Sequence, residues 1–340
     1  MSPDGGDLDL TLDRPDGLGV LATTAPVVAA ARAVRIEPAG VAHAADALAG
    51  RALPVPAWNE RYHWSDGGPR TANTTLLLDA LNFCFWADPG EPRWTLDYHG
   101  ERLDGYWALA AALKRAIEEE GLPLWDAAYL RDIPDADAAR IFHPAGRSVG
   151  RIPLYPARVA NMREAGRVLS ERYGGWFGNA VEAAGYRAPA LARLLAAEFP
   201  SFDDVATYAG RGVRLYKRAQ ICASDLYGVF GGARWGALVN LDGLTAFADY
   251  KVPQILRAEG ILAYAPDLAE SIAALRPLPA GSPEEVEIRA ATVWGVELLR
   301  RALAARGVAA RAFEVDWYLW TLAQDRRDMA PYHRTRTIYY

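Results

Sequence analysis

The sequence of 340 residues predicts a mostly α-helical protein with one small β-hairpin, and three observations lead to that class. Apolar residues recur every three to four positions in several long segments. One segment, around His99-Gly100, alternates polar and apolar residues about a two-residue turn. No glycine-rich phosphate loop of the Rossmann or P-loop kind follows a strand. We therefore expect one helical domain with a minor β element.

The first half of the chain is expected to contain a leader, several helices and the hairpin. Residues 1–25 are rich in Gly, Pro and Asp and predict a flexible leader, with the domain itself spanning residues 26–340. An Ala-rich stretch over residues 26–52 predicts helices interrupted near residues 37–40. Farther on, we expect a buried helix over "TTLLLDALNFCFW" (74–86), the hairpin over "RWTLDYHGERLDG" (93–105), and an amphipathic helix over "YWALAAALKRAIEEEG" (106–121) that Gly121 ends.

The second half is expected to be helical. The apolar spacing predicts helices in "NMREAGRVLSERYGGW" (161–176), "APALARLLAAEFP" (188–200), "VRLYKRAQICASDLYGVFGG" (213–232) and "SPEEVEIRAATVWGVELLRRALAARG" (282–307). The last of these begins with Ser282 as N-cap, Pro283 at the first helical position and Glu285 placed for a capping box.

Composition limits the possible partners. The net charge of −5 argues against a protein that binds a nucleic-acid polymer, which needs a basic surface. No apolar run reaches the roughly 20 residues that span a bilayer, so no membrane association is expected. Cys84 and Cys222 lie far apart without metal-type spacing and are interpreted as small buried side chains of a reduced, cytoplasmic protein. We expect neither a metal nor a cofactor.

Four segments hold more polar and aromatic residues than packing requires. His63 lies between aromatic residues and is either a structural histidine whose hydrogen bonds are satisfied within the protein or a residue that binds the ligand. Asn82 interrupts an apolar run and must find backbone or ligand partners if it is buried. Lys217 belongs to a charged cluster that is a solvated face or a partly buried site. Asp316 sits in an aromatic run, where a carboxylate is paired or used.

Carboxylates among aromatic rings indicate a particular ligand chemistry. Aromatic faces stack on flat rings, and a carboxylate stabilises nearby positive charge. A ribosyl group that becomes an oxocarbenium-like cation as its base leaves fits both properties. In "LTAFADYKVPQ" (244–254), Pro253 suits a first helical turn, so Asp249 is expected at the N-terminal end of a helix whose amides keep the carboxylate ionised. A plain helix cap is the alternative for Asp249.

Six segments in register resemble the queuosine salvage protein family. They are "LNFCFW" (81–86), "YKRAQI" (216–221), "LTAFADYKVPQ" (244–254), "EVEIRA" (285–290), "DWYLW" (316–320) and "PYHRTRTIYY" (331–340). The resemblance implies a mostly helical core similar to helix-hairpin-helix DNA glycosylases. It also implies that the substrate is a small molecule, queuosine 5′-phosphate, and that queuine is released from it for reinsertion into tRNA.

The resemblance also assigns residues. The F-A-D-Y motif of the family falls on Phe247, Ala248, Asp249 and Tyr250, with Asp249 as the catalytic carboxylate. The family's Asp-aromatic pair falls on Asp316 and Trp317, and a further contact position carries Thr321 where relatives can have Asp. A ligand-binding histidine falls on His63.

The residue types suggest which part of the substrate each residue contacts. We expect Asp249 under the sugar, Asp316 on the base, and Lys217 either on the 5′-phosphate or tied to a carboxylate, with Asn82 as a further binding residue. A non-catalytic helical binding or scaffold protein is the alternative from another class. A DNA glycosylase is disfavoured by the net charge and by the lack of an L-P-G-V-G hairpin.

Overall fold

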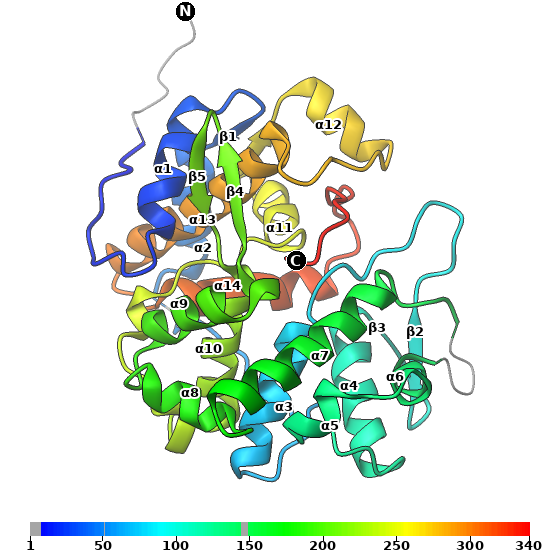
Figure 1. The fold of residues 1–340 in the computed structure, drawn as a ribbon. Coiled ribbons are helices and arrows are strands. Elements are labelled where there is room, and N and C mark those ends of the chain that lie inside the picture. The colour runs from blue at the N-terminus through cyan, green and yellow to red at the C-terminus, as the bar shows by residue number, and fades with distance from the viewer. Residues whose placement is uncertain (1–7, 51, 144–148) are drawn as a thin grey trace, which may run out of the picture. The chain divides into compact units, whose positions relative to one another are not determined.

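A computed structural model describes residues 8–50, 52–143 and 149–340. The chain divides into two compact units. Unit 1 comprises Met1–Pro56, Asp204–Gln220 and Asn240–Arg336; unit 2 comprises Ala57–Asp203, Ile221–Val239 and Thr337–Tyr340. The described residues form fourteen α-helices and three two-stranded antiparallel sheets, which confirms the mostly helical class (Figure 1). The similarity to helix-hairpin-helix glycosylases stays a prediction.

Unit 1 is built around one long helix. Its helices are α1 (Val20–Ala30), α2 (Pro38–Leu48), α11 (Val252–Ala258), α12 (Pro266–Ala273), α13 (Pro283–Ala304) and α14 (Ala312–Asp325), with a short 3-10 turn at Leu241–Gly243. Its strands are β1 (Val34–Ile36), β4 (Val205–Tyr208), β5 (Arg211–Arg214) and β6 (Leu262–Tyr264). Helices α1, α2, α11 and α14 all pack against α13 (Figure 1). Helix α13 is therefore the core of this unit.

The start of α13 follows from its sequence. Ser282 accepts a hydrogen bond from the Glu285 backbone N–H at 3.4 Å, and Pro283 occupies the first turn. The Glu285 carboxylate reaches back to the Gly281 N–H at 3.1 Å, one residue before the cap. The predicted N-cap and first-turn proline are confirmed, but the predicted capping box is not, because Glu285 bonds the N–H of Gly281 and not that of Ser282. Most of the helix is buried, so the buried charged side chains on it need partners.

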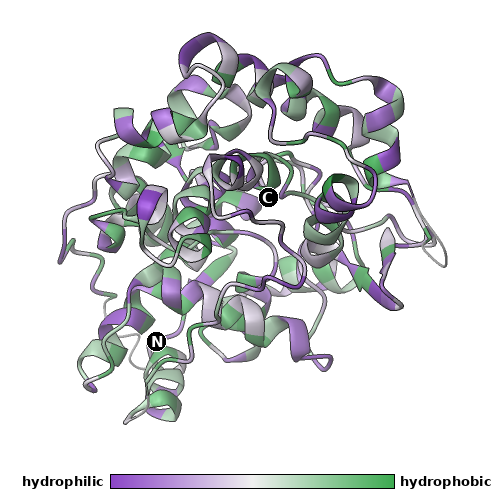
Figure 2. Ribbon diagram, turned by 90° about the horizontal axis from the view of Figure 1, so that it is seen from below, coloured by the Kyte–Doolittle hydropathy of each residue, from purple (hydrophilic) through white to green (hydrophobic). Residues whose placement is uncertain are grey.

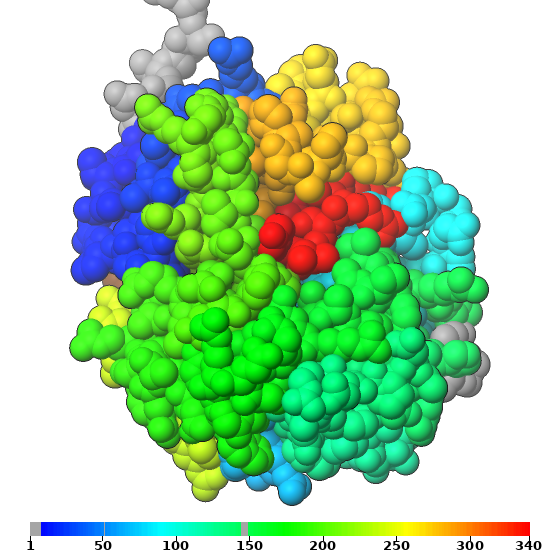
Figure 3. All heavy atoms as spheres, in the orientation of Figure 1, coloured from blue at the N-terminus to red at the C-terminus, as the bar shows by residue number. Residues whose placement is uncertain are grey.

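Two parts of unit 1 differ from the sequence expectation. Val20 and Leu21, within the expected leader, are buried at the start of α1. The helix expected from Val213 begins at Lys217, as α10 (Lys217–Val229), because the preceding residues form β5 of a hairpin with β4. This hairpin, yellow-green in Figure 3, lies beside the blue N-terminal segment, where the Arg214 N–H donates to Thr23 Oγ1 at 3.0 Å.

Unit 2 contains the remaining elements. These are α3 (Pro69–Ala80), β2 (Thr95–Tyr98), β3 (Glu101–Asp104), α4 (Gly105–Glu118), α5 (Ala127–Arg131), α6 (Asp135–Phe142), α7 (Tyr155–Arg172), α8 (Phe177–Ala183), α9 (Ala188–Glu198), the 3-10 turns Pro200–Phe202 and Arg234–Gly236, and α10 from Ile221 onward. Helix α7 packs on α3 and α5. Many helices show both green and purple residues in Figure 2, as amphipathic helices do.

The hairpin expected at residues 93–105 is confirmed as β2 and β3, with His99 and Gly100 both at positive φ in the turn. The helix expected over residues 74–86 is wrong beyond Ala80. There the backbone turns irregular, and the buried Arg158 guanidinium binds the carbonyls of Leu81, Phe83 and Cys84. Those carbonyls are satisfied by a side chain, so they need no helix.

Both cysteines are fully buried free thiols, as expected. No helix among the described residues combines the length and the apolar character needed to cross a membrane.

Candidate active site

Asp249 lies in unit 1 directly before α11, where the sequence predicted it. Its side chain is 7% exposed. Oδ1 accepts hydrogen bonds from the backbone N–H groups of Lys251 and Val252, both at 2.8 Å. The second carboxylate oxygen takes part in neither bond. Asp249 thus closes the turn that starts α11 with one oxygen, an arrangement compatible with a cap and with a catalytic role for the other.

Asp316, on α14, is more deeply buried, at 2% exposure. Its Oδ2 accepts a hydrogen bond from the Phe247 N–H at 2.9 Å, which ties α14 to the segment that carries Asp249. Burial raises the pKa of Asp316 well above its ordinary value, and the charge of Asp249 raises it further. The two carboxylates therefore belong to one electrostatic system in unit 1.

Burial also raises the pKa of Asp249, and this corrects one expectation. From the sequence, only the helix amides that favour the ionised form were expected to act on Asp249. Those hydrogen bonds and the charge of Lys217 do lower the pKa of Asp249, but the loss of water has the largest effect. Burial therefore opposes ionisation of both carboxylates, and because their charges act on each other they titrate as a pair.

Lys217 is the cation that acts on both carboxylates, and Lys251 also lowers the pKa of Asp249. The Lys217 side chain is 4% exposed, and its charge lowers the pKa of both Asp249 and Asp316. Of the two roles expected for Lys217, the tie to the carboxylates is the one with electrostatic support in unit 1. It stands at the first position of α10, where its backbone N–H donates to Asp204 Oδ2 at 3.0 Å.

A buried ion pair supports both Lys217 and Asp249. Arg289 on α13 binds Asp204 through two parallel hydrogen bonds, of 2.9 and 2.6 Å, and both side chains are 3% exposed. Its Nε also donates to the carbonyl of Ala248 at 3.0 Å. One guanidinium therefore holds the residue before Asp249 and, through Asp204, the start of the helix that carries Lys217.

Aromatic side chains surround this part of unit 1. Phe247 is buried, and the ring of Tyr250 packs on that of Tyr332 with a centroid separation of 4.7 Å. Trp317 is half-buried on α14 and meets Phe313 edge to face at 5.1 Å. Thr321 follows Trp317 by one turn and is also half-buried. The structure thus brings Asp249, its neighbours in the F-A-D-Y segment and Asp316 into one unit with Lys217.

The two other predicted residues, His63 and Asn82, lie in unit 2. His63 is 5% exposed and stacks on Trp58; its Nδ1 bonds the Asn59 carbonyl at 2.7 Å and its Nε2 the Tyr106 hydroxyl at 2.8 Å. Burial lowers the pKa of His63 to about 4, so the ring is neutral at pH 7. Asn82 is buried just after α3. Ligand contacts of His63 and Asn82 stay predictions.

The structure adds three supporting residues: Arg289 and Asp204, which sequence reasoning missed, and Gln220, which the sequence showed only as a member of the polar cluster around Lys217. Gln220 is fully buried and exchanges hydrogen bonds with Thr245, whose N–H donates to Gln220 Oε1 at 2.8 Å. Two of the three lie inside motifs quoted above, "EVEIRA" and "YKRAQI". A charged or amide side chain on an otherwise apolar helix face was the available signal, because such a group needs a partner.

The family model described as "Queuosine salvage protein" matches residues 62–340, which include both carboxylates, Lys217 and the Arg289–Asp204 pair. The chain belongs to the queuosine salvage protein family. Among the described residues, no group of three or more His, Cys, Asp or Glu side chains could hold a metal ion.

Curated relatives of this family member cover nearly its whole length. A queuosine 5′-phosphate N-glycosylase/hydrolase from Sphaerobacter thermophilus is 56% identical over 329 residues, 96% of this chain and 99% of the relative. Proteins with the same name from Mus musculus and Schizosaccharomyces pombe are 35% and 33% identical, over 91% and 83% of this chain and 95% and 86% of their own lengths.

Proposed function

We propose that this protein hydrolyses the N-glycosidic bond of queuosine 5′-phosphate and releases queuine and ribose 5-phosphate. Membership of the family and near full-length similarity to its N-glycosylases make the chain an N-glycosidase. The observation that carries the mechanism is the coupled pair of buried carboxylates, Asp249 and Asp316, with Lys217 beside them. A structural core has no need of two buried acids that raise each other's cost of ionisation.

The leaving group explains why two acids are useful. Queuine is a 7-deazaguanine, so it lacks the ring nitrogen at which a departing purine is usually protonated. Its departure then depends on hydrogen bonds to the base and on stabilising the ribosyl cation. In our proposal ionised Asp249 stabilises that cation, and protonated Asp316 donates a hydrogen bond to the base. The departing base takes the electron pair of the broken bond and gains one proton, while water adds to the sugar carbon and loses one, so the products are queuine and ribose 5-phosphate.

The product assay separates this proposal from its alternatives. The protein is incubated with queuosine 5′-phosphate, and free queuine is detected chromatographically; queuosine without the phosphate is run in parallel. Release of queuine is the expected result. Bound but uncleaved substrate would favour a binding protein, and release of a damaged base from a DNA duplex in its place would favour a DNA glycosylase. The cytoplasmic location and the absence of a polymer partner stay predictions.

Trp317 is expected to stack on the substrate, because its half-buried ring follows Asp316 directly on α14. Stacking of a base on an aromatic ring contributes roughly 1–3 kcal/mol, so Trp317→Ala should raise KM about ten- to a hundredfold. Steady-state kinetics measures the change, with the melting temperature as the control for folding. A folded variant with the KM of the unsubstituted protein would remove Trp317 from the substrate site.

Lys217→Met distinguishes the two roles expected for this lysine. Removing the ammonium removes an effect that lowers the pKa of Asp249, so that pKa should rise further. Because our proposal needs Asp249 ionised, the acid limb of the pH profile of kcat/KM should move to higher pH, equally for phosphorylated and unphosphorylated substrate. An unmoved acid limb, with a loss confined to the phosphorylated substrate, would assign Lys217 to the phosphate.

A further inference from the structure

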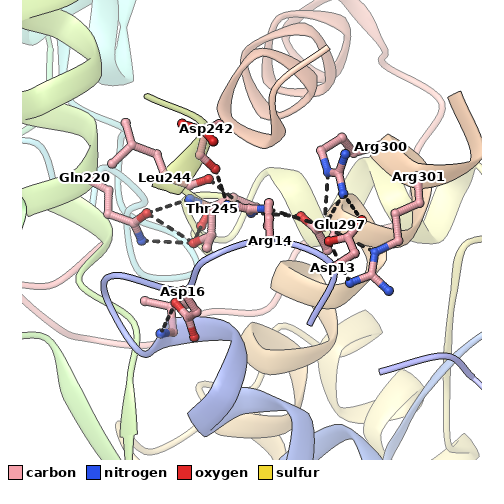
Figure 4. Close-up of polar contacts among 12 residues, drawn as sticks. Asp13, Arg14, Asp16, Gln220, Asp242, Leu244, Thr245, Glu297, Arg300 and Arg301 are labelled. Atoms are coloured by element: carbon pink, nitrogen blue, oxygen red, sulfur yellow. Dashed lines mark hydrogen bonds and ion pairs between the residues drawn. The ribbon is translucent and has the colours of Figure 1, made fainter. Parts of the chain in front are cut away.

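The N-terminal segment before α1 is tied to α13 by a cluster of charged side chains in unit 1 (Figure 4). Glu297 is the centre of the cluster, and its side chain is 1% exposed. It accepts hydrogen bonds from Arg14 at 2.9 Å, Arg300 at 2.7 Å and Arg301 at 3.3 Å. Arg300 also pairs with Asp13 of the same N-terminal segment at 2.7 Å. These bonds fix the N-terminal segment on the helix.

Arg14 differs from the other two arginines in what else it holds. Its guanidinium also donates to the backbone carbonyls of Asp242 and Leu244, the latter at 3.3 Å. Guanidinium is a planar fork with five donors, so one side chain can bind a carboxylate and two carbonyls at once. Only 10% of the Arg14 side chain is exposed, so water competes little for its partly buried bonds to Leu244 and Glu297.

The two carbonyls belong to the segment that leads into the candidate site. Thr245 follows Leu244 and is held by Gln220, which lies one turn after Lys217 on α10. Phe247 comes next but one and donates to Asp316. No α-helix or strand fixes residues 244–250, so side-chain contacts set the conformation of their backbone. Arg14 holds the start of this segment, and Asp249 lies near its end.

We propose that Arg14 is a positioning residue, which orders residues 242–249 so that Asp249 is correctly placed toward substrate. Arg14 lies before the residues 62–340 that the family model matches, so this support comes from outside the matched region. The inference rests on the proposed glycosidase activity, but its structural part can be tested without it. A displacement of about 1 Å at a reacting group can cost on the order of a hundredfold in rate.

The kinetic test compares Arg14→Ala with Arg301→Ala. Arg301 is the matched control, because it binds the same Glu297 and the carbonyls of Asp9 and Thr11, but no carbonyl of residues 242–244. Arg14→Ala should lower kcat about ten- to a hundredfold with KM within about twofold, whereas Arg301→Ala should keep the kcat of the unsubstituted protein. Added guanidinium ion should restore part of the kcat of Arg14→Ala.

Equal kcat for Arg14→Ala and the unsubstituted protein would overturn the proposal. So would an equal fall in both variants, which would show a general effect on stability. If Arg14→Ala does not fold, Arg14→Lys serves instead. Lysine keeps a positive charge beside Glu297 but cannot bridge both carbonyls. The kcat of Arg14→Lys should therefore also fall, while its melting temperature stays near that of the unsubstituted protein. An unchanged kcat in folded Arg14→Lys would likewise overturn it.

Hydrogen exchange separates this inference from the proposed function. Without substrate, backbone amides of residues 244–250 should exchange faster in Arg14→Ala than in the unsubstituted protein and in Arg301→Ala. Failure of the unsubstituted protein to release queuine would refute the proposed function, and these exchange rates would still test whether Arg14 orders the segment. Unchanged exchange at residues 244–250 would refute the positioning role of Arg14 even if queuine is released.

Discussion

Asp249→Asn should reduce turnover of queuosine 5′-phosphate by at least about 100-fold, the scale for removing one preorganised electrostatic group. The amide keeps an oxygen that can accept the N–H groups of Lys251 and Val252, so the turn before α11 should survive. What is lost is the charge that our proposal places under the ribosyl cation. The fall should appear in kcat, with KM and melting temperature near those of the unsubstituted protein.

The same substitution separates catalysis from capping. If Asp249 served only as a cap, Asn would replace it at little cost in stability or activity. Asp249→Ala, which removes the accepting oxygen, is the comparison: it should lose activity and also about 0.5–2 kcal/mol of stability. Turnover by Asp249→Asn above about a tenth of the unsubstituted rate would contradict the catalytic assignment.

Arg289→Met should destabilise the protein by about 3–5 kcal/mol, because it leaves the Asp204 carboxylate buried without its partner. It also removes the donor to the Ala248 carbonyl, so protein that remains folded should turn over substrate more slowly. Urea unfolding followed by circular dichroism measures the free energy of unfolding, and steady-state kinetics at low temperature measures the turnover.

Two further variants make the Arg289 result specific. Arg300→Met removes an arginine from the same helix whose side chain is 16% exposed and whose partner Glu297 keeps two other arginines, so its cost should be below that of Arg289→Met. Adding Asp204→Leu to Arg289→Met removes the buried carboxylate that has lost its ion-pair partner, and should recover part of the lost stability. An unfolding free energy of Arg289→Met within about 1 kcal/mol of the unsubstituted protein would contradict a structural role for the pair.

Local sequence signals predicted those parts of the fold that depend on neighbouring residues. Ser282 and Pro283 mark the start of α13, and the turn at His99-Gly100 marks the hairpin, because cap and turn chemistry act within a few residues. The end of α3 could not be predicted in this way. It depends on Arg158, more than seventy residues away, which binds the carbonyls that would otherwise continue the helix.

In the candidate site, too, the sequence indicated the motif residues but not the effects of residues that are distant along the chain. The resemblance pointed to Asp249, Asp316 and Trp317, and Asp249 does lie directly before a helix. The raised pKa of Asp249 could not be derived from the sequence, because the burial that raises it arises only in the fold, where it outweighs the opposing charge of Lys217. Neither could the roles of Arg14 and Asp204, whose partners lie far away along the chain.

The pH dependence of kcat/KM in Asp316→Asn tests most directly whether Asp249 acts in its ionised form and Asp316 in its protonated form. We expect a bell-shaped profile for the unsubstituted protein: activity falls at low pH as Asp249 gains a proton, and at high pH as Asp316, with its raised pKa, loses one. Asn at position 316 can accept the Phe247 N–H and still donate from its amide at every pH. Asp316→Asn should therefore keep the acid limb and lose the alkaline limb. An alkaline limb that persists unchanged in Asp316→Asn would contradict a protonated Asp316 as the donor to the base.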